Sequence, residues 1–190
     1  MKNKLTLTIG IPAYNEEANI KNMIESVLKQ KGNSFVLEKI LVVLDGCTDN
    51  TFEIVNAVAK KDRRIKIMHD GKRTGKASRL NQIYKMNKSK LIGTFDADIV
   101  FERDFELELM VKEFIRSKMV QVVAGRQLPV KADSLMGRFS NASFLMLQNA
   151  SMRWKNGNNI HSLQGSSSIL RGDFAKLFKY PERLYCIGII

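Results

Sequence analysis

Two aspartates, Asp96 and Asp98, stand one residue apart directly after the apolar segment 91–95. Side chains two residues apart on an extended chain point to the same side, so both carboxylates should face one place. Among apolar neighbours the two charges would repel each other unless a cation lay beside them. A divalent metal ion, completed by water and by the phosphates of a ligand, removes that repulsion. In an irregular loop such a pair would be solvated acids, but its place after a strand and near basic residues favours a metal site.

The segments around this pair alternate between strand-like and helix-like patterns. Strands at 5–11, 37–44, 65–68, 91–95, 120–124 and 164–170 and helices at 15–32, 52–58, 76–86, 105–116, 134–154 and 173–178 are predicted. The first helix should begin at Asn15, because Glu16 and Glu17 suit the positive end of a helix dipole. Strands separated by helices predict an α/β fold, with a mostly parallel sheet covered by helices on both faces. Ligands of such sheets bind at the carboxyl ends of the strands.

The composition indicates a single globular domain that is stabilised by packing alone. The chain has 190 residues, of which 44% are apolar, enough for one sizeable core. Cys47 and Cys186 stand in no metal-ligand pattern, which indicates ordinary thiols and excludes a disulfide framework. No apolar run reaches the roughly 18 residues that a membrane-spanning helix needs, and the N-terminus enters a strand rather than the apolar block of a signal peptide. We therefore expect a reduced, cytoplasmic setting.

Positive charge is concentrated in one stretch of the chain. The net charge is +12, and residues 60–90 alone hold twelve Lys or Arg and two acids. This basic stretch is either a solvated face or a surface for a phosphate-rich ligand, for anionic lipid headgroups or for nucleic acid. Nucleic acid is disfavoured, because Tyr84 is the sole aromatic residue of the stretch and no nucleic-acid-binding motif is present.

Four segments together resemble family 2 glycosyltransferases in their order and spacing. They are IPAYNEE at 11–17, VVLDGCTDNT at 42–51, GKASRLN at 75–81 and FDAD at 95–98, and Gly125-Arg126 and residues 165–173 resemble later blocks of that family. The resemblance implies the GT-A fold, a Rossmann-like sheet in one domain at 1–190, with a nucleotide-sugar-binding half at 1–127 and part of an acceptor-binding half at 128–190. It also implies metal-dependent transfer of a sugar, with inversion, from a nucleotide diphosphate to an acceptor hydroxyl.

The same resemblance assigns roles to individual residues. It implies that the nucleoside contacts Pro12, Ala13, Tyr14 and Glu16, and that Asp45 binds the base or ribose. Lys76 and Ala97 would lie at the donor, where Asp96 and Asp98 would hold Mg²⁺ or Mn²⁺ on the diphosphate. Arg126 would approach the phosphate or the acceptor. Simpler roles stay open for four of them. Tyr14 would then cap the core, Asp45 would form the turn before Gly46, Lys76 would be a helix-start charge and Arg126 a surface charge.

The expected partners follow from this assignment. They are a UDP- or GDP-sugar donor and a saccharide or a lipid-linked acceptor, with no nucleic acid. The basic stretch predicts peripheral contact with an anionic membrane at its inner face. The amphipathic segment 134–154 would either assist at that interface or pack against the core.

Two departures from the family pattern concern acidic residues. The family commonly has two acids before the glycine of the second-strand turn, whereas this chain has Leu44-Asp45-Gly46. The Glu-Asp pair that usually supplies the catalytic base does not follow Asp173. An inverting transfer needs a base near the acceptor hydroxyl. Three readings are open: the chain is cut inside its fold, which the ending Ile-Gly-Ile-Ile favours; Glu182 serves as the base; or the chain is a noncatalytic sugar-nucleotide-binding module.

Overall fold

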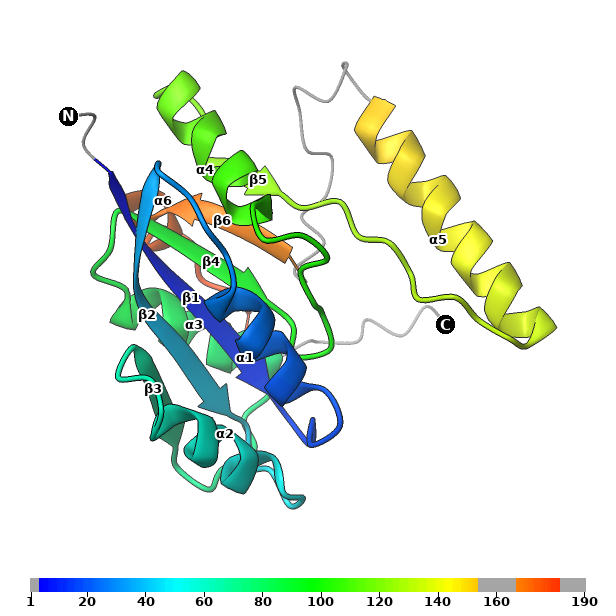
Figure 1. Cartoon of the computed structure of the whole chain (residues 1–190), viewed down its shortest axis with the longest axis horizontal. Helices are drawn as coiled ribbons and strands as arrows, with labels where there is room; N and C mark the ends of the chain where they lie inside the picture. Colours follow the sequence, from blue (N-terminus) through cyan, green and yellow to red (C-terminus); the bar gives the residue numbers. More distant parts are fainter. Residues whose placement is uncertain (1–3, 154–166, 182–190) are drawn as a thin grey trace.

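A six-stranded sheet organises the chain. The structure is a computed structural model that describes residues 4–153 and 167–181 (Figure 1). The strands are β1 (Leu5–Ala13), β2 (Phe35–Leu44), β3 (Ile65–His69), β4 (Leu91–Phe95), β5 (Val122–Ala124) and β6 (Ser167–Arg171), in the spatial order β3-β2-β1-β4-β6-β5. The first four strands are parallel, and β6 pairs antiparallel with both β4 and β5. The predicted α/β fold with a mostly parallel sheet is confirmed.

Helices cover both faces of this sheet. They are α1 (Ile20–Leu28), α2 (Thr51–Ala59), α3 (Lys76–Met86), α4 (Glu106–Arg116), α5 (Leu135–Arg153) and α6 (Gly172–Ala175). Buried apolar residues of α1, α2 and α4 form one core cluster with β1, and those of α3 and α6 form a second cluster on the opposite face. In Figure 1, α5 lies to one side of the sheet rather than on either face. None of the described helices is long and apolar enough to cross a membrane.

The prediction that α1 begins at Asn15 is wrong, because the helix begins at Ile20. Asn15 adopts a left-handed backbone conformation with φ of 52°. The backbone N–H of Glu16 donates to Thr51 Oγ1 at 2.8 Å and that of Glu17 to Asp49 Oδ2 at 3.1 Å. These N–H groups are therefore committed to the turn after β2. The helix starts only after them, and it ends at Leu28 rather than at Gly32.

Other element boundaries differ by a few residues. β1 continues through Pro12 to Ala13, beyond the predicted end at Ile11. Its pairing with β4 ends at Gly10, so from there β1 pairs only with β2 and a missing proline N–H is tolerated. β6 continues to Arg171, one residue beyond its predicted end, and α6 is shorter than predicted. Residues 154 and 164–166 of the predicted elements lie outside the described residues.

Glu108 fastens α4 to the segment before β2. The carboxylate is buried and accepts hydrogen bonds from the backbone N–H of Ser34 at 3.0 Å and from Ser34 Oγ at 2.8 Å. Lys112 Nζ lies 3.4 Å from Glu108 Oε1. Burial acts to raise the pKa of Glu108, but the bonds from Ser34 and the ion pair with Lys112 outweigh it, so the pKa lies below the ordinary value.

Glu108→Gln should lower the free energy of unfolding at pH 7 by about 1.5–3 kcal/mol, because it removes the charge and replaces one of the two acceptor oxygens by an NH2 group that cannot accept from Ser34. A depressed folded-state pKa gives stability that is present above the unfolded-state pKa and is lost as the pH falls through the folded-state value. Urea unfolding between pH 7 and 3 should therefore show a smaller acid loss in the variant than in the wild type. Glu113→Gln, at an exposed position of the same helix, is the matched control. Equal effects of the two substitutions would contradict this account.

The loop at 70–75 lies directly on the turn after β2. Gly46 in that turn has φ of +68°, and a Cβ at this position would lie 2.9 Å from the backbone nitrogen of Arg73. Gly71 has a similar φ of +70°, but a Cβ there would meet nothing within 4 Å. Both glycines have a positive φ, which other residues rarely adopt. Of the two, only Gly46 also has the backbone of another segment, at Arg73, within contact of its Cβ position.

Gly71→Ala should therefore lower the free energy of unfolding by about 1–2 kcal/mol, the cost of a left-handed alanine, and Gly46→Ala should lower it further. The two losses, measured side by side by urea unfolding, separate backbone strain from the contact with Arg73. Equal losses would mean that the loop does not rest on the turn.

Candidate active site

The first group of candidate residues lies at the carboxyl ends of β1 and β2. Pro12 and Ala13 are buried at the end of β1, and the Ala13 carbonyl oxygen accepts a bond from the backbone N–H of Asp45 at 2.8 Å. Glu16 follows half-buried in the next turn, and its Oε2 accepts a bond from Asn19 Nδ2 at 2.9 Å. The structure thus brings the predicted nucleoside residues of β1 beside Asp45.

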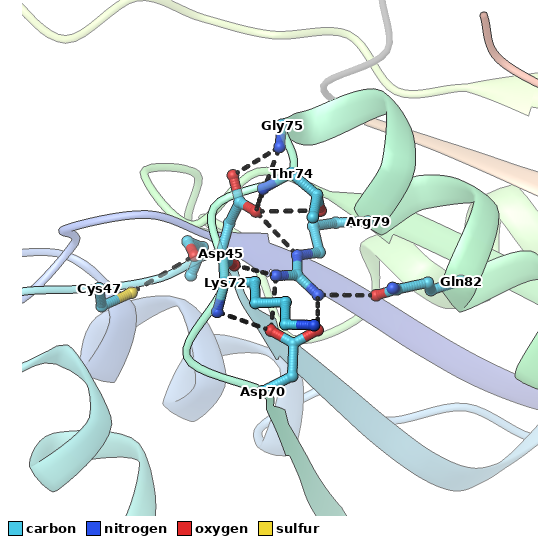
Figure 2. Close-up of polar contacts among 9 residues, drawn as sticks. Asp45, Cys47, Asp70, Lys72, Thr74, Gly75, Arg79 and Gln82 are labelled. Carbon is cyan, nitrogen blue, oxygen red and sulfur yellow. Dashed lines mark hydrogen bonds and ion pairs between the residues drawn. The ribbon is translucent and has the colours of Figure 1, made fainter. Parts of the chain in front are cut away.

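Asp45 is 5% exposed and is surrounded by hydrogen-bond donors. Its carboxylate accepts bonds from the backbone N–H of Thr74 at 2.7 Å, from that of Gly75 at 3.0 Å and from Arg79 Nε at 2.8 Å (Figure 2). Burial acts to raise the pKa of Asp45, but the bonds from Thr74, Arg79 and Gly75 prevail and lower it. The carboxylate is therefore ionised and joins the turn after β2 to the start of α3.

The guanidinium group of Arg73 lies over the ring of Tyr14, which follows β1 and is half-buried. The guanidinium carbon lies 3.8 Å from the ring centroid, and Nη1 donates to Tyr14 Oη at 3.0 Å. A cation over an aromatic face is attracted by the ring quadrupole. The sequence did not predict Arg73 as a site residue, because there it is only one of the cations of the basic stretch.

Lys76 and Asp96 form an ion pair at the carboxyl end of β4. Lys76 Nζ lies 2.6 Å from Asp96 Oδ2, with both side chains partly exposed. Lys76 begins α3, as predicted, but its ammonium group binds Asp96 rather than serving only as a helix-start charge. This contact places a cation next to the proposed metal ligand.

Asp96 and Asp98 line the same cleft, although for a different reason than an extended chain. The backbone turns after Asp96, whose carbonyl oxygen accepts a bond from the N–H of Ile99 at 3.3 Å. Ala97 is buried and Asp98 is exposed. Both carboxylates nevertheless border a cleft of about 770 Å³.

This cleft lies between the ends of the strands, α4 and α5. Arg126 lines it from the segment after β5, and Phe144 lines it from α5. Two further acids that were not predicted as site residues, Glu102 and Glu106, also border the cleft. The remaining lining is largely apolar, from residues such as Val100, Leu109, Leu128 and Val130. Charged side chains from the segments after β4 and β5 and from the start of α4 thus border a cleft whose other lining is mostly apolar.

The two aspartates suit a hard divalent cation. Carboxylate oxygens are ligands that Mg²⁺ and Mn²⁺ prefer, and one or two carboxylates suffice where phosphates and water complete the shell. Across residues 4–153 and 167–181, no group of three or more His, Cys, Asp or Glu side chains is placed to hold a metal ion. Asp96 and Asp98 could therefore hold such an ion only together with a ligand. Glu182, the candidate base in one of the three open readings, lies outside the described residues.

Comparisons with known proteins relate the chain to glycosyltransferases. The sequence profile of "Glycosyl transferase family 2" matches residues 8–178. The chain is 34% identical over 117 residues to the chondroitin synthase of Pasteurella multocida (strain Pm70), a match that covers 62% of this chain and 12% of that protein. The chain thus spans a small part of this relative.

Two solved structures share the fold. A mannosyltransferase from Pyrobaculum calidifontis, in complex with GDP-Man and Mn²⁺, has a TM-score of 0.70 at 17% identity, over 96% of this chain and 49% of that one. S. aureus TarS 1-349 in complex with UDP has a TM-score of 0.68 at 19% identity, over 96% of this chain and 52% of that one. These likenesses confirm the expected GT-A fold. Since the family profile matches most of the sequence, the chain belongs to glycosyl transferase family 2.

Proposed function

We propose that this chain binds a nucleotide diphosphate sugar through a divalent metal ion and transfers the sugar, with inversion, to an acceptor hydroxyl. The observation that carries the proposal is the pair Asp96 and Asp98, which border one cleft at the carboxyl end of β4 beside Lys76. The complexes of two fold neighbours with GDP-Man and Mn²⁺ and with UDP support this choice of ligand. UDP- and GDP-sugars are therefore the donors to test.

The donor would lie along the edge formed by β1, β2 and β4. Pro12, Ala13, Tyr14 and Glu16 would contact the nucleoside, and Asp45 would accept a bond from the base or a ribose hydroxyl. Ala97 is small and buried between the two aspartates, which lets the backbone approach the diphosphate. These assignments place the nucleoside at β1 and β2 and the phosphates at β4.

The chemistry requires stabilisation of the departing diphosphate and a base for the acceptor. Bound Mg²⁺ or Mn²⁺ would neutralise negative charge on the diphosphate. Asp96 and Asp98 would hold that ion, while Lys76 and Arg126 would supply further positive charge at the leaving group. A saccharide or a lipid-linked acceptor would occupy the cleft under α5. Its hydroxyl needs a base, for which Glu182 is a candidate.

Nucleotide binding should depend on metal, because the diphosphate would otherwise face two carboxylates. Calorimetric titration of the wild type with UDP and with GDP should show binding in Mn²⁺ that weakens at least about tenfold in EDTA. Asp98→Ala should remove this difference while the protein stays folded. Asp104→Ala, at an exposed acid that pairs with Lys31 and does not border the cleft, should keep it. Equal affinity with and without metal would exclude the proposed donor site.

The basic stretch at 60–90 supports contact with an anionic membrane. Eleven of its twelve Lys and Arg side chains are exposed, and Arg79 is the buried one. Sedimentation with liposomes should show binding that requires acidic lipid and weakens steeply as salt rises.

A charge-reversed pair of variants separates this surface from net charge. Changing Lys60, Lys61 and Arg63 to Glu should abolish liposome binding. Changing the exposed Lys29, Lys118 and Lys131 to Glu makes the same change in net charge outside the stretch and should weaken binding much less. Indifference of the wild type to lipid charge would leave the stretch as a solvated face.

A further inference from the structure

Arg79 of α3 has no exposed surface, which is rare for a guanidinium group. A buried cation is tolerated when its charge and its N–H groups are matched by partners. Here all five N–H groups are matched. Nε donates to Asp45 Oδ1 at 2.8 Å, Nη1 to Asp70 Oδ2 and Gln82 Oε1 at 3.0 Å each, and Nη2 to Asp70 Oδ1 at 2.8 Å and to the Lys72 carbonyl oxygen (Figure 2).

These partners come from three separate segments of the fold. Asp45 follows β2, Asp70 and Lys72 belong to the loop after β3, and Gln82 lies one turn further along α3. The five N–H groups of the planar Arg79 guanidinium thus fix the turn after β2, the loop after β3 and α3 relative to one another. A lysine could not do this, because its ammonium group is a compact charge with three donors.

The two oxygens of Asp45 have different surroundings. Oδ1 accepts from Arg79 Nε and from the backbone N–H of Thr74, at 2.8 and 2.7 Å, and more distantly from Gly75 at 3.2 Å. Oδ2 accepts only from the N–H of Gly75, at 3.0 Å, among the bonds found in the described part of the chain. A carboxylate oxygen can accept about two hydrogen bonds. Oδ1 is therefore saturated, and Oδ2 has room for one more donor.

We propose that Arg79 is a positioning residue that acts through Asp45 on the donor nucleotide. By engaging Oδ1, Arg79 holds the carboxylate so that Oδ2 is presented to an N–H or O–H group of the nucleoside. This inference rests on the proposed function, because it takes the nucleoside to lie at the ends of β1 and β2. Arg79 itself touches no ligand in this arrangement.

A purely structural role and a positioning role predict different outcomes. If Arg79 only stabilised the fold, a folded variant would bind nucleotide normally. If it positions Asp45, a folded variant should bind UDP or GDP more weakly, and the loss should disappear when Asp45 can no longer accept the bond as a carboxylate.

The test is Arg79→Lys, titrated in Mn²⁺ with whichever of UDP and GDP the wild type binds. We expect a dissociation constant at least about tenfold higher, with the melting temperature measured alongside. In an Asp45→Asn background the same substitution should change the dissociation constant less than about twofold, because the two residues act as one unit. An equal loss in both backgrounds would overturn the inference.

Two further variants guard against a folding defect. Arg171→Lys alters another arginine, half-buried in β6, whose bonds go to the carbonyl oxygens of Phe114, Ser117 and Val120. It should cost stability but leave nucleotide affinity unchanged. Asp70→Asn weakens the network from its exposed side and should raise the dissociation constant severalfold in a folded protein, so it decides the question even if Arg79→Lys does not fold.

The outcomes separate the two proposals. If the wild type bound neither UDP nor GDP, the proposed function would be wrong, and this inference with it. If the wild type bound one of them and both Arg79→Lys and Asp70→Asn bound it equally well, only the positioning role would be wrong.

Discussion

The parallel pairing of β1 with both β2 and β4 is the constraint on which the site depends. Parallel strands end at the same edge of a sheet, so the residues after Ala13, Leu44 and Phe95 must meet there, although they are far apart in the sequence. Because helices cover both faces, the strands are apolar and buried, and their edge is the place where charged groups can reach a ligand. The sheet therefore determines both where the site lies and which residues compose it.

Elements with strong local signals could be predicted from the sequence. The bounds of α3 and β4 coincide with the predicted ones, because Gly75 precedes the helix and the charged Asp96 follows a mostly apolar strand. The start of α1 could not be predicted. Glu16 and Glu17 resemble the acidic first turn of a helix, but their N–H groups bind residues more than thirty positions away. Long-range hydrogen bonds prevailed over a local preference, and no pattern within the segment reveals them.

The site was predicted unevenly for the same reason. Asp96 and Asp98 could be found because two acids after an apolar strand need an explanation wherever the strand lies. The role of Arg79 could not be predicted, because it depends on ion pairs with Asp45 and Asp70, which come from other segments. One signal was available: Arg79 lies four residues before Ile83, on the face of α3 that is otherwise buried and apolar.

The division of the chain into a nucleotide-sugar-binding half at 1–127 and an acceptor-binding half at 128–190 stays a prediction. In the sheet, β6 of the second half lies between β4 and β5 of the first half.

The internal ion pairs also change the meaning of the basic stretch. Within residues 60–90, Arg64 pairs with Asp62, Arg79 with Asp45 and Asp70, and Lys76 with Asp96. Arg79 is therefore buried against its two acids, whereas Arg64 and Lys76 stay exposed to solvent while each pairs with one acid. Asp98 is exposed and has no ion-pair partner in the part of the chain that the structure describes. An unneutralised carboxylate beside cationic groups attracts a cation that a diphosphate can share. The exposed Asp98 carboxylate thus lies at the position where the proposed donor would bring its metal ion.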